Sequence, residues 1–300
     1  MLGQTGQLGA ERVDRGSGIR ERAAFLPFGA GDDQLFVCTY EPAGESVGSV
    51  LICSSILADF LANYQREVNL ARAFAKAGMT AVRFHYRGTG HSDGDPAAMT
   101  LASLEADARW AAEQLTSWRP DLPIAFLGTR WGALSATAAA RDYGDAPVEL
   151  CEPIIDFGRY YSDAMRSRSM SAMATGKSRK DATQVSELLA RDGHADIVGN
   201  VIHSALYDST VGVDPVALLS EGKARAALLV QFGGKDVRAP LRKVEQKLVG
   251  AGWRATSRTV DVAENWWFRT GRRMVAQDEL DDASRTWLRT ELETTRQDER

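Results

Sequence analysis

Short apolar segments of strand type alternate with helical segments along most of this 300-residue chain. The strand-type segments are runs of apolar and β-branched residues, whereas the helical segments repeat apolar residues at spacings of three and four. Such alternation is typical of a mostly parallel sheet with helices on both faces. We therefore predict an α/β fold around an eight-stranded sheet that opens with a hairpin. The predicted strands cover residues 23–28, 34–40, 48–55, 79–86, 122–128, 146–151, 226–234 and 255–262.

The first predicted helix follows the strand at 48–55. Apolar residues recur there at Leu61, Tyr64 and Val68, and Gly78 ends the pattern. A second helix is predicted to begin after Thr100, a residue type that caps helix N-termini. Both helices belong to the strand–helix–strand units of the predicted sheet.

About 70 residues separate the sixth predicted strand from the seventh, far more than the dozen or so that a crossover needs. We predict a helical cap at 153–223, inserted into an α/β core made of 21–152 and 224–300. The cap is rich in Met, Tyr and Arg, which suits either a lid over an apolar ligand or ordinary helix packing. Residues 1–20 are rich in Gly and charge and are predicted to be flexible.

The balance of charge argues against two classes of partner. Lys and Arg total 36 against 40 Asp and Glu, a formal net charge of −4, so no basic footprint for nucleic acid or an anionic membrane is expected. No apolar run approaches the ~18 residues of a membrane span. The three cysteines and a start without an apolar secretion segment predict a reduced, cytoplasmic protein. Homo-oligomerisation stays open.

The segment FLGTRWGALS, residues 126–135, predicts a strand that turns sharply into a helix of small residues. Gly128 and Gly132 flank the turn, and Arg130 lies at its apex. Turns of this shape usually present a serine nucleophile above the sheet. A guanidinium with a pKa above ~12 is neither a nucleophile nor a base at neutral pH, so Arg130 cannot form an acyl-enzyme.

Three further signatures accompany this turn in a fixed order. The four signatures are FHYRGTGHSDG at 84–94, GTRWGA at 128–133, GGKD at 233–236 and ENWWF at 264–268. Together they resemble the α/β-hydrolase superfamily over roughly residues 23–295, with the character of esterase and serine-aminopeptidase-like members, including the exosortase-associated hydrolases. The resemblance implies the fold of that superfamily.

The same resemblance implies where a Ser-His-Asp triad would lie. Asp236 matches the acid, Arg130 stands in the place of the serine, and Trp266 or Trp267 stands where the histidine would fall. An indole has one N–H donor and no useful titration. The mechanism of the triad is therefore not expected in this chain.

An arginine beside the N-terminus of a helix makes a place for an anion. We predict that Arg130 binds a carboxylate or a phosphate, with Trp131, Trp266 and Trp267 as apolar walls and Tyr160 contributed by the cap. The predicted partner is a small acidic or acyl-bearing metabolite.

Two serines after the third predicted strand, Ser54 and Ser55, are predicted to donate hydrogen bonds to a ligand oxygen, although loop serines need no such role. A simpler interpretation also stands: Arg130 and Asp236 pair with each other and fill the site without any ligand. The two interpretations are compatible if a ligand competes for the pair.

Other candidates for chemistry are weaker. Cys53 follows a strand near the catalytic edge of the sheet, but free cysteines mostly act as small buried hydrophobes. Glu152 would serve as an acid or base if partly buried. His85 and His91 bracket a glycine-rich loop and are expected to hold it rather than to carry protons. The chain contains no metal-binding or nucleotide-binding motif, so no metal and no cofactor are predicted.

Two function classes follow. In the first, the chain is a repurposed biosynthetic enzyme that acts on its ligand by orientation and electrostatics, without a covalent serine intermediate. In the second, it is a catalytically inactive pseudo-hydrolase that binds a protein partner. Fold alone does not separate them, since function resides in the site.

Overall fold

A computed structural model of the chain describes residues 7–174, 184–223, 225–262 and 277–298. Its main sheet has nine strands in the order β1-β2-β3-β5-β4-β6-β7-β10-β11, and β8 and β9 form a separate pair. The strands are β1 (Gln7–Val13), β2 (Arg20–Pro27), β3 (Gln34–Glu41), β4 (Ser49–Cys53), β5 (Thr80–Phe84), β6 (Ile124–Thr129), β7 (Val148–Cys151), β8 (His194–Ile197), β9 (Asn200–His203), β10 (Ala226–Phe232) and β11 (Arg254–Val260).

The predicted parallel sheet is confirmed from β5 to β11, and the hairpin of β2 and β3 is antiparallel as predicted. The strand count differs from the predicted eight. The additional strand is β1, within the segment 1–20 that was predicted to be flexible, and it pairs with β2. Asp14 closes their turn by accepting the N–H groups of Gly16 and Ser17, and Gly18 supplies a φ of 70°.

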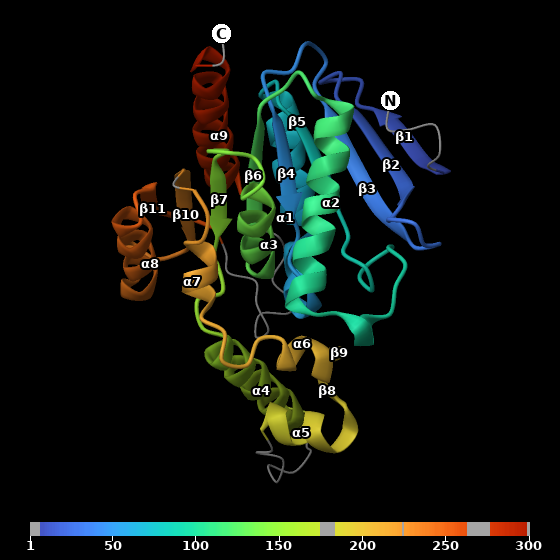
Figure 1. Cartoon of the computed structure of the whole chain (residues 1–300), viewed down its shortest axis with the longest axis vertical. Helices are drawn as coiled ribbons and strands as arrows, with labels where there is room; N and C mark the ends of the chain where they lie inside the picture. Colours follow the sequence, from blue (N-terminus) through green and yellow to red (C-terminus); the bar gives the residue numbers. More distant parts are fainter. Residues whose placement is uncertain (1–6, 175–183, 224, 263–276, 299–300) are drawn as a thin grey trace.

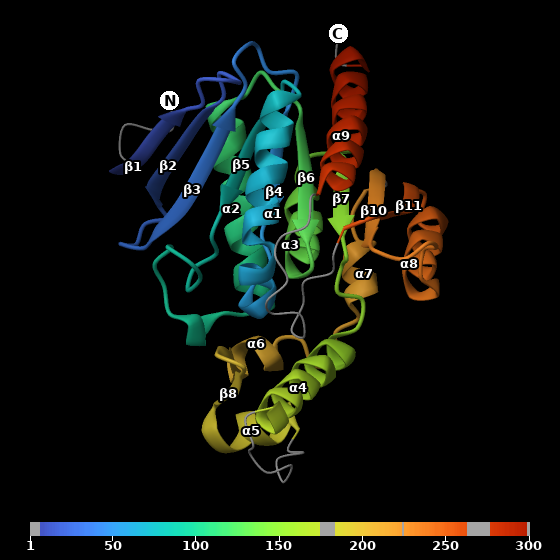
Figure 2. The ribbon, with the colours of Figure 1, turned by 180° about the vertical axis from the view of Figure 1, so that it is seen from behind.

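Helices cover both faces of the sheet (Figures 1 and 2). On one face α1 and α9 pack over a cluster of apolar side chains, and on the other α2, α3 and α8 do so. As predicted, Thr100 caps α2, since its hydroxyl accepts from the N–H of Ser103 at 3.0 Å. The helices are α1 (Leu57–Lys76), α2 (Leu101–Trp118), α3 (Trp131–Ala140), α4 (Phe157–Ala174), α5 (Val185–Asp192), α6 (Ser204–Asp208), α7 (Pro215–Leu219), α8 (Ala239–Gly250) and α9 (Asp278–Asp298).

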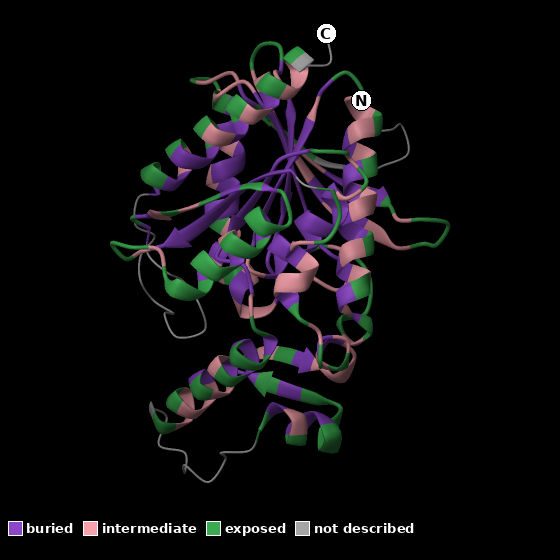
Figure 3. Ribbon diagram, turned by 60° about the vertical axis from the view of Figure 1, so that its left-hand side comes forward, coloured by how far each residue is buried: buried purple, intermediate pink, exposed green. Residues whose placement is uncertain are grey.

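Burial is concentrated in the strands at the centre of the core (Figure 3). Strands β4, β5, β6, β7 and β10 are buried along their whole length. Because both faces of these strands are covered, their sequences are continuous apolar runs rather than alternating ones. No described helix is long and apolar enough to cross a membrane.

The segment predicted as a cap lies between β7 and β10 and covers the end of the core at which the parallel strands terminate (Figures 1 and 2). It contains helices α4, α5, α6 and α7 but also the β8–β9 hairpin, which the helical prediction did not include. Gly199, with a φ of 80°, lies in the turn of that hairpin.

Candidate functional site

The turn between β6 and α3 has the tight geometry that its glycines predict. Arg130 is the residue before α3 and has φ 57° and ψ −113°, a region that side chains other than glycine rarely adopt. A Cβ on Gly128 would lie 2.2 Å from the carbonyl oxygen of Gly132. A Cβ on Gly132 would lie 1.9 Å from the carbonyl oxygen of Cys53 at the end of β4. Glycine is therefore needed at both positions.

The side chain of Arg130 pairs with a carboxylate that the sequence did not single out. Its Nε donates to Oδ2 of Asp59, in the first turn of α1, at 3.0 Å. The side chain of Asp59 is fully buried, whereas that of Arg130 is 17% exposed. The predicted pairing of Arg130 with Asp236 is thus replaced by a pairing with Asp59.

Burial dominates the electrostatics of this pair. It raises the pKa of Asp59 above the usual value, and the charge and hydrogen bond of Arg130 lower it only in part. Burial also acts to lower the pKa of Arg130, but the charge and hydrogen bond of Asp59 together with the charges of Tyr160 and Glu152 outweigh it, and the pKa of Arg130 stands above its usual value. Arg130 therefore remains a cation at every physiological pH.

Asp236 lies in the loop after β10 and is exposed. Its backbone carbonyl accepts from Nε2 of Gln231 at 3.1 Å. In the sheet β7 lies between β6 and β10, and Glu152 directly follows β7.

Glu152 is largely buried, which is the condition that a role as an acid or base requires. It is 7% exposed and has a φ of 46°, unusual for a residue with a side chain. Its carboxylate accepts the N–H of Phe232 at 2.8 Å and a short hydrogen bond from Arg238. Burial raises the pKa of Glu152, against the lowering effect of Arg238 and of Arg130. The strand ends thus hold two carboxylates and two guanidinium groups.

Aromatic side chains from the cap cover the turn. Trp131 is 1% exposed and contacts Phe157 and Tyr160 of α4, with ring centroids 5.2 and 5.3 Å away. The guanidinium carbon of Arg130 lies 5.5 Å from the centroid of the Tyr160 ring. The structure thus brings three of the residues named for the site together, Arg130, Trp131 and Tyr160.

The other predicted walls, Trp266 and Trp267, lie outside the described residues. Ser54 and Ser55 follow β4 and are 1% and 0% exposed. The backbone N–H of Ser55 donates to the buried carboxylate of Glu67 in α1 at 3.4 Å. Both serines therefore lie in the interior beside α1.

The polar interior face of α1 explains why Asp59 was overlooked. Asp59, Asn63 and Glu67 recur at a spacing of four and are all buried, and Arg66 joins them. Glu67 lies 3.5 Å from Arg83 of β5. The signal in the sequence that could have identified this face of α1 was the run of polar residues at helical spacing. Apolar spacing instead predicts a buried face that includes Leu61, which is 71% exposed.

The thiols and histidines fit structural roles. Cys53 is fully buried, and burial raises its thiol pKa far above the usual range, which disfavours the reactive thiolate. Nδ1 of His85 accepts the backbone N–H of His91 at 3.0 Å, so His85 holds the glycine-rich loop as predicted. Burial, together with the charges of Arg83 and His91, lowers the pKa of His85 to about 3.

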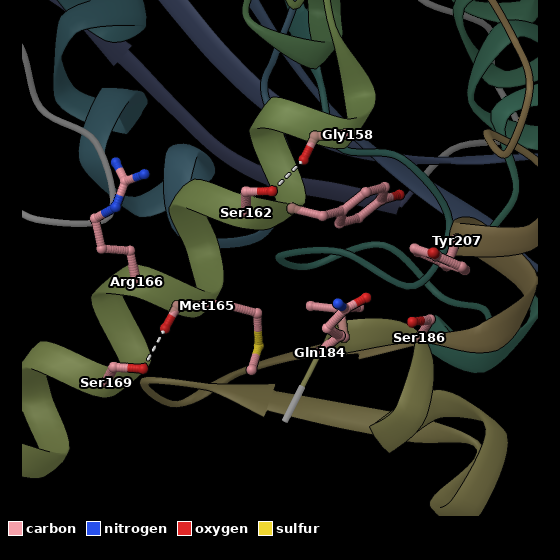
Figure 4. A pocket seen from close by; sticks show the side chains of 10 residues that line it. Gly158, Ser162, Met165, Arg166, Ser169, Gln184, Ser186 and Tyr207 are labelled. Carbon is pink, nitrogen blue, oxygen red and sulfur yellow. Dashed lines mark hydrogen bonds between the residues drawn. The ribbon is translucent and has the colours of Figure 1, made fainter. Parts of the chain in front are cut away.

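A hollow of about 520 Å³ lies within the cap itself, between α4, the start of α5 and Tyr207 (Figure 4). Tyr161 and Met165 of α4 line it. Tyr161 and Tyr207 have ring centroids 4.9 Å apart, and the Tyr161 hydroxyl lies 3.0 Å from Oγ1 of Thr210. These residues therefore line an interior of the cap, whereas Tyr160 alone among the tyrosines of α4 faces the turn.

Within the described part of the chain, no group of three or more His, Cys, Asp or Glu residues could hold a metal ion. The charged groups at the strand ends are instead arranged as ion pairs, Asp59 with Arg130 and Glu152 with Arg238.

The comparisons with known proteins bear on the fold of the chain. No protein-family model matches the chain, and no curated protein matches it significantly. Among solved structures, Est1E from Butyrivibrio proteoclasticus with bound ferulic acid is 12% identical, over 89% of this chain and 98% of that chain, at a TM-score of 0.60. A lipase in its open form is 17% identical, over 92% and 99%, at a TM-score of 0.56.

A third solved structure, DcsB in complex with its substrate analogue, is 14% identical, over 96% of this chain and 99% of that chain, at a TM-score of 0.54. These likenesses extend over nearly all of each chain and agree with the mostly parallel sheet and the turn after β6. The chain therefore has the α/β-hydrolase fold.

Proposed function

We propose that this chain binds a small molecule carrying a carboxylate or an acyl group at Arg130, beneath the cap, and acts on it without a covalent serine intermediate. The observation that carries this proposal is the guanidinium at the apex of the β6–α3 turn, held from behind by the fully buried Asp59 and still 17% exposed.

The geometry of the turn supports this role. In this fold the apex of the turn is the point at which a nucleophile attacks an acyl group. A guanidinium placed there contributes a permanent positive charge and N–H donors held in one plane. Such a group favours a planar anion that accepts two hydrogen bonds.

The surroundings of Arg130 supply orientation and exclude water. Trp131 and Tyr160 are 1% and 4% exposed and form apolar walls beside the charge. A charge in a site of low dielectric constant stabilises developing negative charge more strongly than it would in water. Rearrangement, cyclisation or condensation of a biosynthetic intermediate would gain from such a site.

One observation favours a second candidate. Asp59 already neutralises Arg130, and its complete burial is what a purely structural ion pair would show. In that case the chain is a catalytically inactive protein of the hydrolase fold that binds a protein partner on its surface.

Native mass spectrometry of freshly purified protein separates the two candidates. The proposal expects a stoichiometric acidic small molecule that is retained by the wild type and lost from Arg130→Gln. The matched control is Arg109→Gln, which removes an arginine paired with Asp142 at the surface between α2 and the end of α3. Retention of the same molecule by Arg130→Gln, or a co-purified protein in its place, would favour the second candidate.

A further inference from the structure

Four charged side chains follow one another at the carboxyl ends of β4, β6, β7 and β10, which are neighbours in the sheet in that order. Asp59 belongs to the helix that follows β4, and Arg130 directly follows β6. Glu152 directly follows β7, and Arg238 is the residue before the helix that follows β10. Asp59 pairs with Arg130, and Glu152 pairs with Arg238. The signs along this row of charges are therefore negative, positive, negative and positive.

The two central residues of the row, Arg130 and Glu152, have matching backbone positions. Thr129 and Cys151, the residues before them, are partners in the pairing of β6 with β7. The N–H of Arg130 donates to the carbonyl oxygen of Cys151 at 2.9 Å. Arg130 and Glu152 both have a positive φ, 57° and 46°, which costs free energy in a residue with a side chain. Because neighbouring strands lie about 4.8 Å apart, two strained residues of opposite charge start side by side.

This neighbourhood limits which ligands can bind at Arg130. A carboxylate bound there lies near Asp59, which contacts Arg130, and near Glu152 on the adjacent strand. Carboxylates repel one another, and they do so more strongly where the dielectric constant is low. A positive group on the ligand, next to its carboxylate, would remove the repulsion by Glu152.

Arg238 already holds a cation against Glu152, and its position allows it to leave. The side chain of Arg238 is 49% exposed, whereas that of Glu152 is 8% exposed. An arginine this exposed exchanges its partner for water at little cost. Glu152 also accepts the N–H of Phe232 at 2.8 Å, a bond that does not depend on Arg238. An ammonium group can therefore replace the guanidinium of Arg238 and supply the same counter-charge to Glu152.

We propose that the ligand is a zwitterion, a small amino carboxylate whose carboxylate binds Arg130 and whose ammonium group binds Glu152 in place of Arg238. This inference rests on the function proposed above and deepens it, since it names the substrate class of the same site. It assigns to Glu152 the selection of ligands that carry an amine.

The test is isothermal titration calorimetry of the full chain with pairs of compounds that differ only in an amine. The pairs are glycine and acetate, 3-aminopropionate and propionate, 4-aminobutyrate and butyrate, and 5-aminopentanoate and pentanoate. At least one amino carboxylate should bind about tenfold more tightly than its partner, which is the effect of one charge-assisted hydrogen bond. Equal or weaker binding of the amino compound in every pair would overturn the proposal.

Two variants locate the effect. Glu152→Gln keeps an oxygen for the N–H of Phe232 but loses the charge, so it should abolish the preference for the amine without weakening the plain carboxylates. Arg238→Gln, at a half-exposed position that tolerates substitution, removes the competing guanidinium and should increase the preference. The matched control is Glu149→Gln, a fully buried carboxylate of β7 that binds Ser284 of α9, which should keep the wild-type preference.

Two results with these variants would refute the role of Glu152. The first is a preference for the amine in Glu152→Gln that equals that of the wild type. The second is a preference in Arg238→Gln that is no greater than that of the wild type, which decides the question even if Glu152→Gln does not fold.

Arg130→Gln separates failure of this inference from failure of the proposed function. If it weakens both members of each pair, and the amine adds affinity in the wild type, both proposals hold. If it weakens both members but the amine adds nothing in the wild type, the anion site is right and the zwitterion is wrong. If it changes nothing and butylamine binds as tightly as 4-aminobutyrate, the anion site is wrong, and the zwitterion is wrong with it because an amine alone suffices.

Discussion

Arg130 and Asp59, 71 positions apart in the sequence, join the apex of the β6–α3 turn to the first turn of α1 through a bond of 3.0 Å from Nε to Oδ2. Asp59 is fully buried, and among the described residues its second oxygen has no hydrogen-bond partner. A carboxylate in that position depends on one guanidinium for its stabilisation. Asp59, rather than an acid at the position expected for a triad, therefore orients the side chain of Arg130.

The first prediction concerns this pair. Asp59→Asn should lower the free energy of unfolding by about 3 kcal/mol, because it leaves a mostly buried guanidinium without its counter-charge. Arg130→Gln should cost less, since Asp59, whose pKa burial already raises, can take up a proton. Urea denaturation of both single variants and the double variant measures the coupling. Strictly additive effects would show that the pair is not an energetic unit.

An exposed pair provides the comparison for that experiment. Arg285 and Asp282 lie on the surface of α9 at 2.8 Å, with side chains 45% and 66% exposed. Their coupling should fall below about 1 kcal/mol, because solvent screens it.

The second prediction concerns pH. Glu149 of β7 is fully buried and accepts hydrogen bonds from Ser284 and Cys151, and burial raises its pKa to about 7 from the model-compound value of 4.5. Between these two values the folded state binds more protons than the unfolded state. Stability should therefore be highest below pH 4.5 as far as this group is concerned, and should fall by about 3 kcal/mol as the pH rises to 7.

Glu149→Gln should remove this loss, because the amide oxygen still accepts from Ser284 and no charge is buried. Unfolding free energies at pH 5, 6, 7 and 8 measure the slope. The control is Glu45→Gln, at an exposed position, which should keep the wild-type slope. An unchanged slope in Glu149→Gln would contradict the prediction.

The third prediction concerns the backbone of the turn. Gly132→Ala should destabilise the protein by more than about 3 kcal/mol, because its Cβ would lie 1.9 Å from a main-chain oxygen that no rotamer change can move. Gly250→Ala is the matched change at a helical glycine with no atom within 4 Å of the added Cβ, and it should be neutral or slightly stabilising. Thermal unfolding compares the two. Similar melting temperatures for both variants would show that the turn is looser than described.

The fourth prediction concerns nucleophiles. With Arg130 at the apex, the wild type should not be labelled by fluorophosphonate serine probes and should not turn over aryl esters. In-gel fluorescence and a p-nitrophenyl ester assay measure this. Labelling of any serine in folded protein that persists in Arg130→Gln would contradict a mechanism without covalent serine chemistry.

The fifth prediction concerns the thiols. Cys53 and Cys151 are fully buried, and burial raises the thiol pKa of both. Folded protein at pH 8 should therefore react slowly with iodoacetamide at these two positions, and rapidly after denaturation. Mass spectrometry of tryptic peptides follows each cysteine. Fast alkylation of Cys53 in the folded protein would make it a candidate nucleophile again.

The local pattern of the sequence determined the parallel core, the β2–β3 hairpin and the N-terminal capping of α2 by Thr100. It also determined the tight turn that Gly128 and Gly132 flank. These features depend on spacing, capping and backbone clashes among near neighbours, so a short stretch of chain specifies each of them. They place a permanent cation at the end of β6.

Only the tertiary structure decided which groups surround the guanidinium of Arg130. The contact of Arg130 with Asp59 and the pairing of β1 with β2 depend on how separate segments of the chain pack. Sequence spacing could not identify Asp59 as the partner because it lies on the polar interior face of α1, where burial against the sheet rather than proximity in sequence brings charges together. Asp236 matched the sequence pattern of an acid, but the structure places it exposed in the loop after β10, whereas Asp59 is the carboxylate that Arg130 contacts.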